Sequence, residues 1–177
     1  MLRRNLHFAP RTVKTKAYFS CVRPILEYAS TCWSPSSVKL NSTIEMVQHT
    51  AAKFVCNAYP KKGQYENFSI TRLIDNLQWD TLEERRDSAK LCMAFKILNG
   101  GVILPPDVLP RAVSCRARSC NEPNVGEVNK LHEPRARLIT TGRTFVYSAP
   151  RLWNEKVTPA QANAKTLESF KDYFSTK

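Results

Sequence analysis

Apolar residues recur every three or four positions through most of the first 100 residues, the spacing of one helical face. In residues 12–33, Pro24 interrupts this pattern, because proline removes an intrahelical hydrogen bond and disfavours helical dihedrals at the residue before it. We predict a bent element, either one kinked helix or two helices with Pro24 in the first turn of the second. A straight helix over residues 12–33 would contradict this. The apolar positions are Val13, Ala17, Cys21, Val22, Ile25, Leu26, Ala29 and Trp33.

Two further helices are predicted where a serine precedes such a pattern. One begins after Ser36 or Ser37, either of which can accept a hydrogen bond from the first turn. The other begins after Ser69 and has room for two to three turns. The buried face of the longer helix is expected to carry Leu40, Ile44, Val47, Ala51, Phe54 and Val55.

The stretch DTLEERR predicts another helix start, with Asp80 as the cap and Glu83 reaching back to complete a capping box. Gly100 and Gly101 should end this helix, since helices commonly end with a residue in the left-handed backbone conformation and glycine adopts it most easily. From about residue 105 the chain changes character, because arginines and prolines replace the apolar anchors.

The C-terminal part predicts less regular structure. TFVYS, residues 144–148, is expected to form a short strand or an extended packing segment. Thr166 should cap a last helix that turns its apolar side inward. The inward residues would be Leu167, Phe170, Tyr173 and Phe174.

These patterns predict a mainly α protein. We expect a small helical bundle over residues 1–104, a basic linker over 105–143, and a C-terminal docking segment with a short helix over 144–177.

The net charge of the chain indicates which class of partner it could bind. The chain has 27 Lys and Arg against 15 Asp and Glu, a formal net charge of +12. Such a balance favours a ligand that carries phosphates, because cations set against phosphates release condensed counterions. An anionic membrane surface or an acidic protein would be attracted as well, so charge alone leaves these alternatives open.

No catalytic motif is present. The five glycines form neither a phosphate-binding loop nor a nucleophile elbow. Cys115 and Cys120 with His132 lack a convincing fourth zinc ligand, so free cysteines in a loop are the favoured interpretation. We expect no metal and no cofactor.

The sequence has neither an apolar run of membrane-spanning length nor the apolar core of a secretion signal. We therefore expect an intracellular chain with reduced thiols and no membrane partner.

Basic residues interleaved with aromatic ones can follow a nucleic-acid backbone while the rings stack on bases. A solvated charged face is the alternative for any single residue. The candidate phosphate contacts, chosen by charge and position, are Lys14, Lys16, Arg23, Lys61, Lys62, Arg85 and Arg86.

Several separated blocks occur in the order in which a known family has them: VKTKAYFSCVRPILEYASTCWSP, IEMVQHTAAKFV, LQWDTLEERRDSAKLCMAFKILNG, FVYSAPRLWN and LESFKDYF. Together they resemble the region downstream of the polymerase palm in reverse transcriptases of non-LTR (LINE-like) retrotransposons. The ending YSAPRLWNEKV departs from the family, which usually has an aromatic residue before the proline and Leu-Pro after Trp-Asn.

The resemblance implies a helical thumb and the segment after it, which grip the template–primer duplex. LRRNL, residues 2–6, is similar to the sequence just before that region in the family. The family's magnesium-binding aspartates lie upstream of this segment, and this chain has no Asp-Asp pair. It therefore implies a noncatalytic fragment that binds RNA or RNA–DNA duplex nonspecifically, with the missing palm domain or another protein as a further partner. The alternative is a degenerate or host-retained helical module for protein interaction.

Overall fold

The computed structural model describes residues 2–33, 35, 37–59, 69–103, 109, 130–135, 137–138 and 141–174. Within these residues the chain is mainly α-helical and contains no β-strand, which confirms the predicted fold class. The chain forms two compact units. Unit 1 comprises Met1–Ala29 and Pro35–Arg85, and unit 2 comprises Ser30–Ser34 and Arg86–Lys177. The division falls within the helix at residues 82–98, between Arg85 and Arg86.

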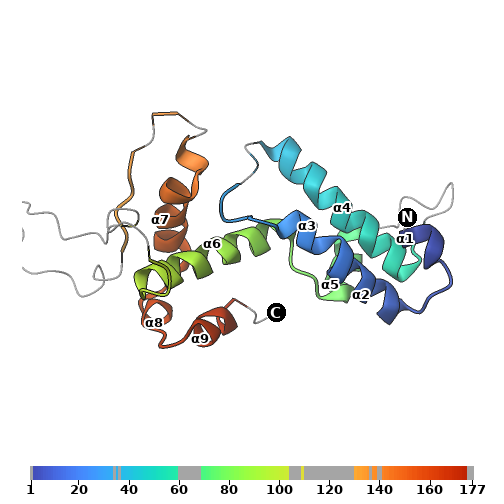
Figure 1. The fold of residues 1–177 in the computed structure, drawn as a ribbon. Coiled ribbons are helices and arrows are strands. Elements are labelled where there is room, and N and C mark those ends of the chain that lie inside the picture. The colour runs from blue at the N-terminus through green and yellow to red at the C-terminus, as the bar shows by residue number, and fades with distance from the viewer. Residues whose placement is uncertain are drawn as a thin grey trace, which may run out of the picture. The chain divides into compact units, whose positions relative to one another are not determined.

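Unit 1 is built from short helices around one long one (Figure 1). The second helix, α2, contacts both α3 and α4, and α4 contacts α5. The unit also includes the first turn of α6. The helices are α1 (Leu2–Asn5), α2 (Arg11–Cys21), α3 (Arg23–Glu27), α4 (Val38–Cys56), α5 (Ile70–Leu77) and α6 (Leu82–Leu98).

The predicted break at Pro24 is confirmed, in its two-helix form. α2 ends before Val22, and α3 begins at Arg23 with Pro24 in its first turn. Backbone N–H groups in the first turn of a helix have no intrahelical acceptor, so the N–H that proline lacks costs no hydrogen bond there. The apolar pattern, however, does not remain helical to residue 33: α3 stops at Glu27, and Ala29 takes a positive φ of 49°.

Ser37 caps α4, since its side chain accepts a hydrogen bond from the backbone N–H of Leu40 over 3.3 Å. The buried face of α4 is rotated from the predicted one. Gln48 is buried, whereas Leu40 and Val47 are 51% and 38% exposed. A search for apolar residues cannot identify this face, because the polar Gln48 is buried through hydrogen bonds of its amide to two other segments.

Tyr18 is the centre of the unit 1 interior. Its ring stacks on Trp79 with centroids 4.8 Å apart, and its hydroxyl donates a hydrogen bond to Gln48 Oε1 over 3.1 Å. Gln48 Nε2 in turn donates to the backbone carbonyl of Asp80 over 2.8 Å. These contacts join α2, α4 and the turn before α6 through one satisfied buried network.

The start of α5 agrees with the sequence, because Ser69 accepts a hydrogen bond from Arg72 N–H. The capping box of α6 lies one residue later than predicted. Thr81 Oγ1 accepts from Glu84 N–H, and Glu84 Oε2 accepts from Thr81 N–H, each over 3.1 Å. Thr81 and Glu84 have the same spacing of three as the predicted pair, so the sequence contains the capping-box motif twice, one residue apart.

At its other end α6 stops as predicted. Gly100 takes a φ of +72°, which glycine adopts at little cost, and Gly101 N–H donates to the Lys96 carbonyl over 2.7 Å.

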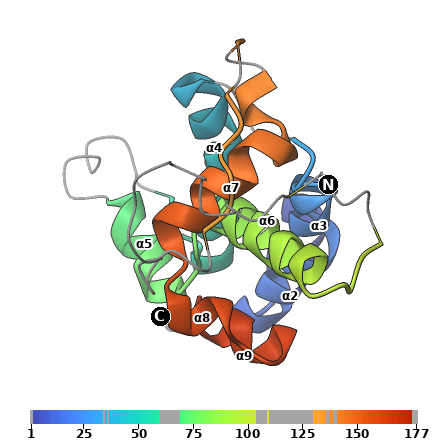
Figure 2. The same cartoon turned by 90° about the vertical axis from the view of Figure 1, so that its left-hand side faces the viewer.

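Unit 2 gathers its helices around the C-terminal part of α6 (Figures 1 and 2). Asn154 on α7 fixes an extended segment beside that helix. It exchanges two hydrogen bonds of 2.9 Å with the backbone of Leu131. The remaining elements are the 3-10 helix η1 (Thr141–Arg143), α7 (Phe145–Lys156), α8 (Pro159–Ala162) and α9 (Leu167–Asp172). The core comprises Leu91, Ala94, Phe95, Leu109, Leu131, Ala149, Trp153 and Phe170.

The strand or extended segment predicted at residues 144–148 is wrong, because all but the first of these residues belong to α7. Ala149 and Trp153 continue from Phe145 at steps of four, and this helical face packs on the core. Thr166 caps α9 as predicted, accepting from Ser169 N–H over 3.2 Å. Tyr173 differs from the expectation, since it is 49% exposed.

Candidate nucleic-acid interface

Lys14, the first candidate phosphate contact, lies in the interior of unit 1 with an exposed fraction of 0%. Its Nζ donates a hydrogen bond to Asn57 Oδ1 over 2.6 Å and lies 5.1 Å from the centroid of the Phe54 ring. Asn57 is the left-handed residue that ends α4, so this cation sits beside the negative end of that helix dipole. The side chain therefore holds α2 to α4 and is not presented to a ligand.

Arg23 and Arg85 share one carboxylate. Arg85 is hydrogen-bonded to Glu27, and this bond raises the pKa of its guanidinium. Arg23 Nε lies 3.6 Å from the same carboxylate. Burial, and after it the charge of Arg85, lowers the pKa of Arg23, whose guanidinium carbon also lies 4.0 Å from the Phe19 ring centroid. Both arginines are half-buried structural groups.

Arg86 is 2% exposed, and its guanidinium carbon lies 5.7 Å from the centroid of the Trp33 ring in the same unit. The structure thus places this candidate in the interior as well. Lys61 and Lys62 lie outside the described residues. Of the predicted contacts that are described, Lys16 alone has the exposed side chain that phosphate binding needs.

Sequence reasoning missed three exposed cations, Arg3, Arg4 and Arg11. With Lys16 they form what we call the N-terminal basic surface. The absence of acidic residues could have revealed them, because residues 2–26 contain six Lys and Arg but no Asp or Glu. An exposed cation without neighbouring carboxylates keeps its field for an external anion.

Local structure fixes the arrangement of these cations. Arg3 and Arg4 lie on α1, where the Arg3 guanidinium carbon is 4.3 Å from the centroid of the Tyr59 ring. Arg11 is the first residue of α2, and Lys16 follows within two turns. Pro10 provides no side-chain cap to α2, so the positive end of that helix dipole adds to the field at Arg11.

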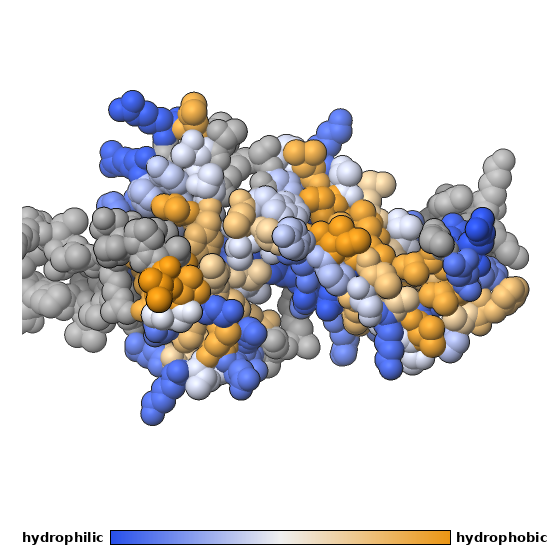
Figure 3. Space-filling view, in the orientation of Figure 1, coloured by the Kyte–Doolittle hydropathy of each residue, from blue (hydrophilic) through white to orange (hydrophobic). Residues whose placement is uncertain are grey.

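The hydropathy view shows hydrophobic residues along α3 and α4, and hydrophilic residues at the α1 end and at other places on unit 1 (Figure 3). The hydrophobic surface has large exposed fractions: Ile25 74%, Tyr28 79%, Val38 86% and Met46 62%. Unit 1 therefore exposes apolar side chains on α3 and α4 in addition to the cations of the N-terminal basic surface.

The described residues contain no group of three His, Cys, Asp or Glu side chains placed to hold a metal ion. His132 is exposed, and Cys115 and Cys120 lie outside the described part of the chain. Among the described helices, none combines the length and the apolar character that a bilayer crossing requires.

Comparisons with known proteins identify no relative. No family model, no curated protein and no solved structure matches the chain.

Proposed function

We propose that this chain is a noncatalytic fragment, similar to the thumb and post-thumb region of non-LTR retrotransposon reverse transcriptases, that binds RNA or RNA–DNA duplex through the N-terminal basic surface. The supporting observation is the exposure of Arg3, Arg4, Arg11 and Lys16 in a segment without carboxylates. The ordered sequence blocks that resemble the family point to the same class of ligand.

The chemistry of this surface favours phosphate recognition without sequence readout. Arginine guanidinium groups can donate two parallel hydrogen bonds to a phosphate, whereas Lys16 supplies a single strong charge. Contacts of this kind fix the position of a nucleic-acid backbone but carry no information about its bases. We therefore expect nonspecific binding that weakens steeply as salt rises.

The test is fluorescence-anisotropy titration of a labelled RNA–DNA hybrid at several salt concentrations. One variant changes Arg3, Arg4, Arg11 and Lys16 together to Gln. A matched control changes four exposed cations of unit 2, Lys96, Arg135, Arg151 and Lys165, to Gln. Both variants lower the formal net charge from +12 to +8, so any difference between them reports position and not total charge.

We expect the first variant to lose about three from the slope of log affinity against log salt, since each phosphate contact contributes about 0.7 to 0.9. The control should keep most of the slope. Equal losses in both variants would show that binding follows net charge alone. Absence of binding at low salt by the folded wild-type chain would refute the proposal.

The exposed apolar side chains of α3 and α4 favour a second candidate, a helical protein-interaction module. Apolar association persists or strengthens as salt rises, whereas phosphate binding weakens. A variant with Ile25, Tyr28 and Val38 changed to Gln should retain hybrid binding if the basic surface is the functional one. Loss of a salt-insensitive association in this variant would favour the module.

A further inference from the structure

A tight turn joins α1 to α2 and presents two aromatic side chains. The backbone N–H of Ala9 donates to the carbonyl of Leu6 over 3.1 Å, which leaves His7 and Phe8 as the two central residues of the turn. Pro10 follows immediately, and its ring fixes its own φ, here −64°, and restricts the dihedrals of Ala9 before it. The hydrogen bond and the proline both restrict the conformations open to this turn.

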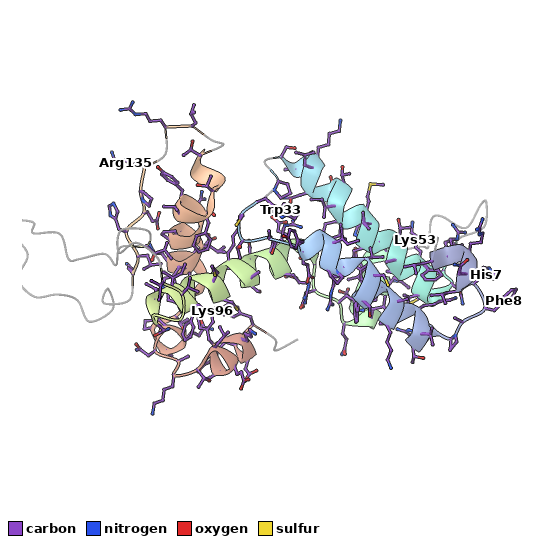
Figure 4. The ribbon with its side chains drawn as sticks, in the orientation of Figure 1. His7, Phe8, Trp33, Lys53, Lys96 and Arg135 are labelled. Carbon is purple, nitrogen blue, oxygen red and sulfur yellow. The ribbon has the colours of Figure 1, made fainter. Side chains whose placement is uncertain are left out.

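Phe8 is 97% exposed, the largest exposure of any aromatic side chain in the described part of unit 1. Figure 4 shows Phe8 pointing away from the neighbouring helices, with His7 beside it. The two rings meet edge to face with centroids 4.8 Å apart, so His7 orients Phe8 without covering it.

A single exposed apolar side chain is ordinary on a protein surface. The position of Phe8 in the sequence suggests a role in binding, because it lies between Arg4 and Arg11 in the segment that lacks carboxylates. Proteins hold single-stranded nucleic acid with aromatic rings set among cations: the cations follow the phosphates and a ring stacks on a base.

We propose that Phe8 stacks on an unpaired base of the nucleic acid whose phosphates contact the N-terminal basic surface. The ligand class is then a single strand, or a duplex that carries a single-stranded overhang. This inference rests on the proposed function and specifies its ligand. Bases inside a continuous duplex are already stacked on one another and offer no free face to the ring.

An anionic membrane would satisfy the same cations, but the turn is poorly suited to insertion. Leu6 and Ala9 on either side of the two aromatic residues are half-buried, so one apolar ring alone projects. Stable membrane binding through side chains needs a wider apolar face. One ring is sufficient to stack on one base.

The experiment compares anisotropy titrations of three probes at one low salt concentration: a short single-stranded RNA, an abasic strand of equal length, and a blunt RNA–DNA hybrid. The abasic strand keeps the phosphates but has no base to stack on. The variants are Phe8→Leu and Phe8→Trp, with Val38→Ala as a control at another exposed apolar position of unit 1. Phosphatidylserine vesicles serve as a fourth probe.

We expect Phe8→Leu to weaken binding of the single strand about ten-fold and to leave the abasic strand and the blunt hybrid unchanged. Phe8→Trp should retain affinity, and Val38→Ala should match wild type. If Phe8→Leu weakens the abasic strand equally, stacking is refuted.

If Phe8→Leu changes nothing while the four-residue Gln variant abolishes binding, stacking fails and the proposed function survives. Binding of vesicles but of no nucleic acid would overturn both proposals, and so would the absence of any binding.

Discussion

The guanidinium of Arg85 donates two hydrogen bonds to the carboxylate of Glu27, one from Nε to Oε1 and one from Nη2 to Oε2, the latter over 3.2 Å. Arg23 lies 3.6 Å from the same carboxylate, so one anion stands between two cations. Paired and planar recognition of this kind is stronger than a simple surface ion pair. Glu27 therefore joins the start of α6 to α3 and offsets the repulsion between the two arginines.

Glu27→Gln should destabilise the fold more than Arg85→Gln does. The first change leaves two arginines facing each other, whereas the second removes the repulsion together with the bond. We expect a loss of about 1 to 2 kcal/mol for Glu27→Gln and less than about 1 kcal/mol for Arg85→Gln. Urea unfolding followed by circular dichroism measures both, and the reverse order would contradict this account.

Stability should fall at high pH through Tyr18. Burial raises the pKa of its hydroxyl from 10.0 to about 12. The unfolded chain loses this proton near pH 10 while the folded chain retains it, so stability is full below the unfolded pKa and falls as pH rises toward the folded one. The loss should be on the order of 2 kcal/mol. Urea midpoints between pH 9 and 12 should fall more steeply for wild type than for Tyr18→Phe; parallel curves would exclude Tyr18 as the cause.

Lys14 and Lys16 should behave oppositely although they are two residues apart. Lys16→Met should lower the salt slope of hybrid binding by about 0.7 to 0.9, since one exposed cation is lost. Lys14→Met should leave the slope unchanged, because the Lys14 side chain is buried against Asn57. Salt titrations of both variants decide the matter. A reduced slope for a folded Lys14→Met protein would return Lys14 to the interface.

The core of unit 2 should depend heavily on Phe170, which is 0% exposed. Its ring stacks on Phe95 with centroids 4.5 Å apart and on Trp153 with centroids 5.7 Å apart. Phe170→Ala should cost about 3 to 5 kcal/mol, and Phe170→Leu less, because leucine leaves a smaller cavity. Unfolding followed by tryptophan fluorescence would detect the loss, and a cost below about 1 kcal/mol for alanine would contradict this packing.

Most helices of the described chain could be predicted because their apolar spacing and their capping residues agree. Ser37, Ser69 and Thr166 each accept the hydrogen bond expected of an N-cap. The exceptions have local physical reasons. Phe145 and its two neighbours favour an extended backbone by propensity, yet the packing of Ala149 and Trp153 makes this stretch a helix.

The candidate site was harder to predict than the fold. Charge and position identify cations, but they do not reveal whether a cation faces solvent. Lys14 and Arg86 are buried through contacts with residues distant in sequence, which no local pattern contains. The exposed Arg3 and Arg11 could have been found by counting carboxylates as well as cations along the segment.

The break between α2 and α3 also makes the N-terminal basic surface depend on the folded unit, because it leaves two short helices. α2 has 11 residues and α3 has five, both below the roughly 12 to 15 at which an isolated helix becomes stable in water. Each helix is therefore maintained by tertiary packing, including the contacts of α2 with α4 and of Tyr18 with Trp79. A synthetic peptide of residues 1–26 would carry every cation of this surface and lose their arrangement, so recognition belongs to the folded unit and cannot be transplanted as a linear motif.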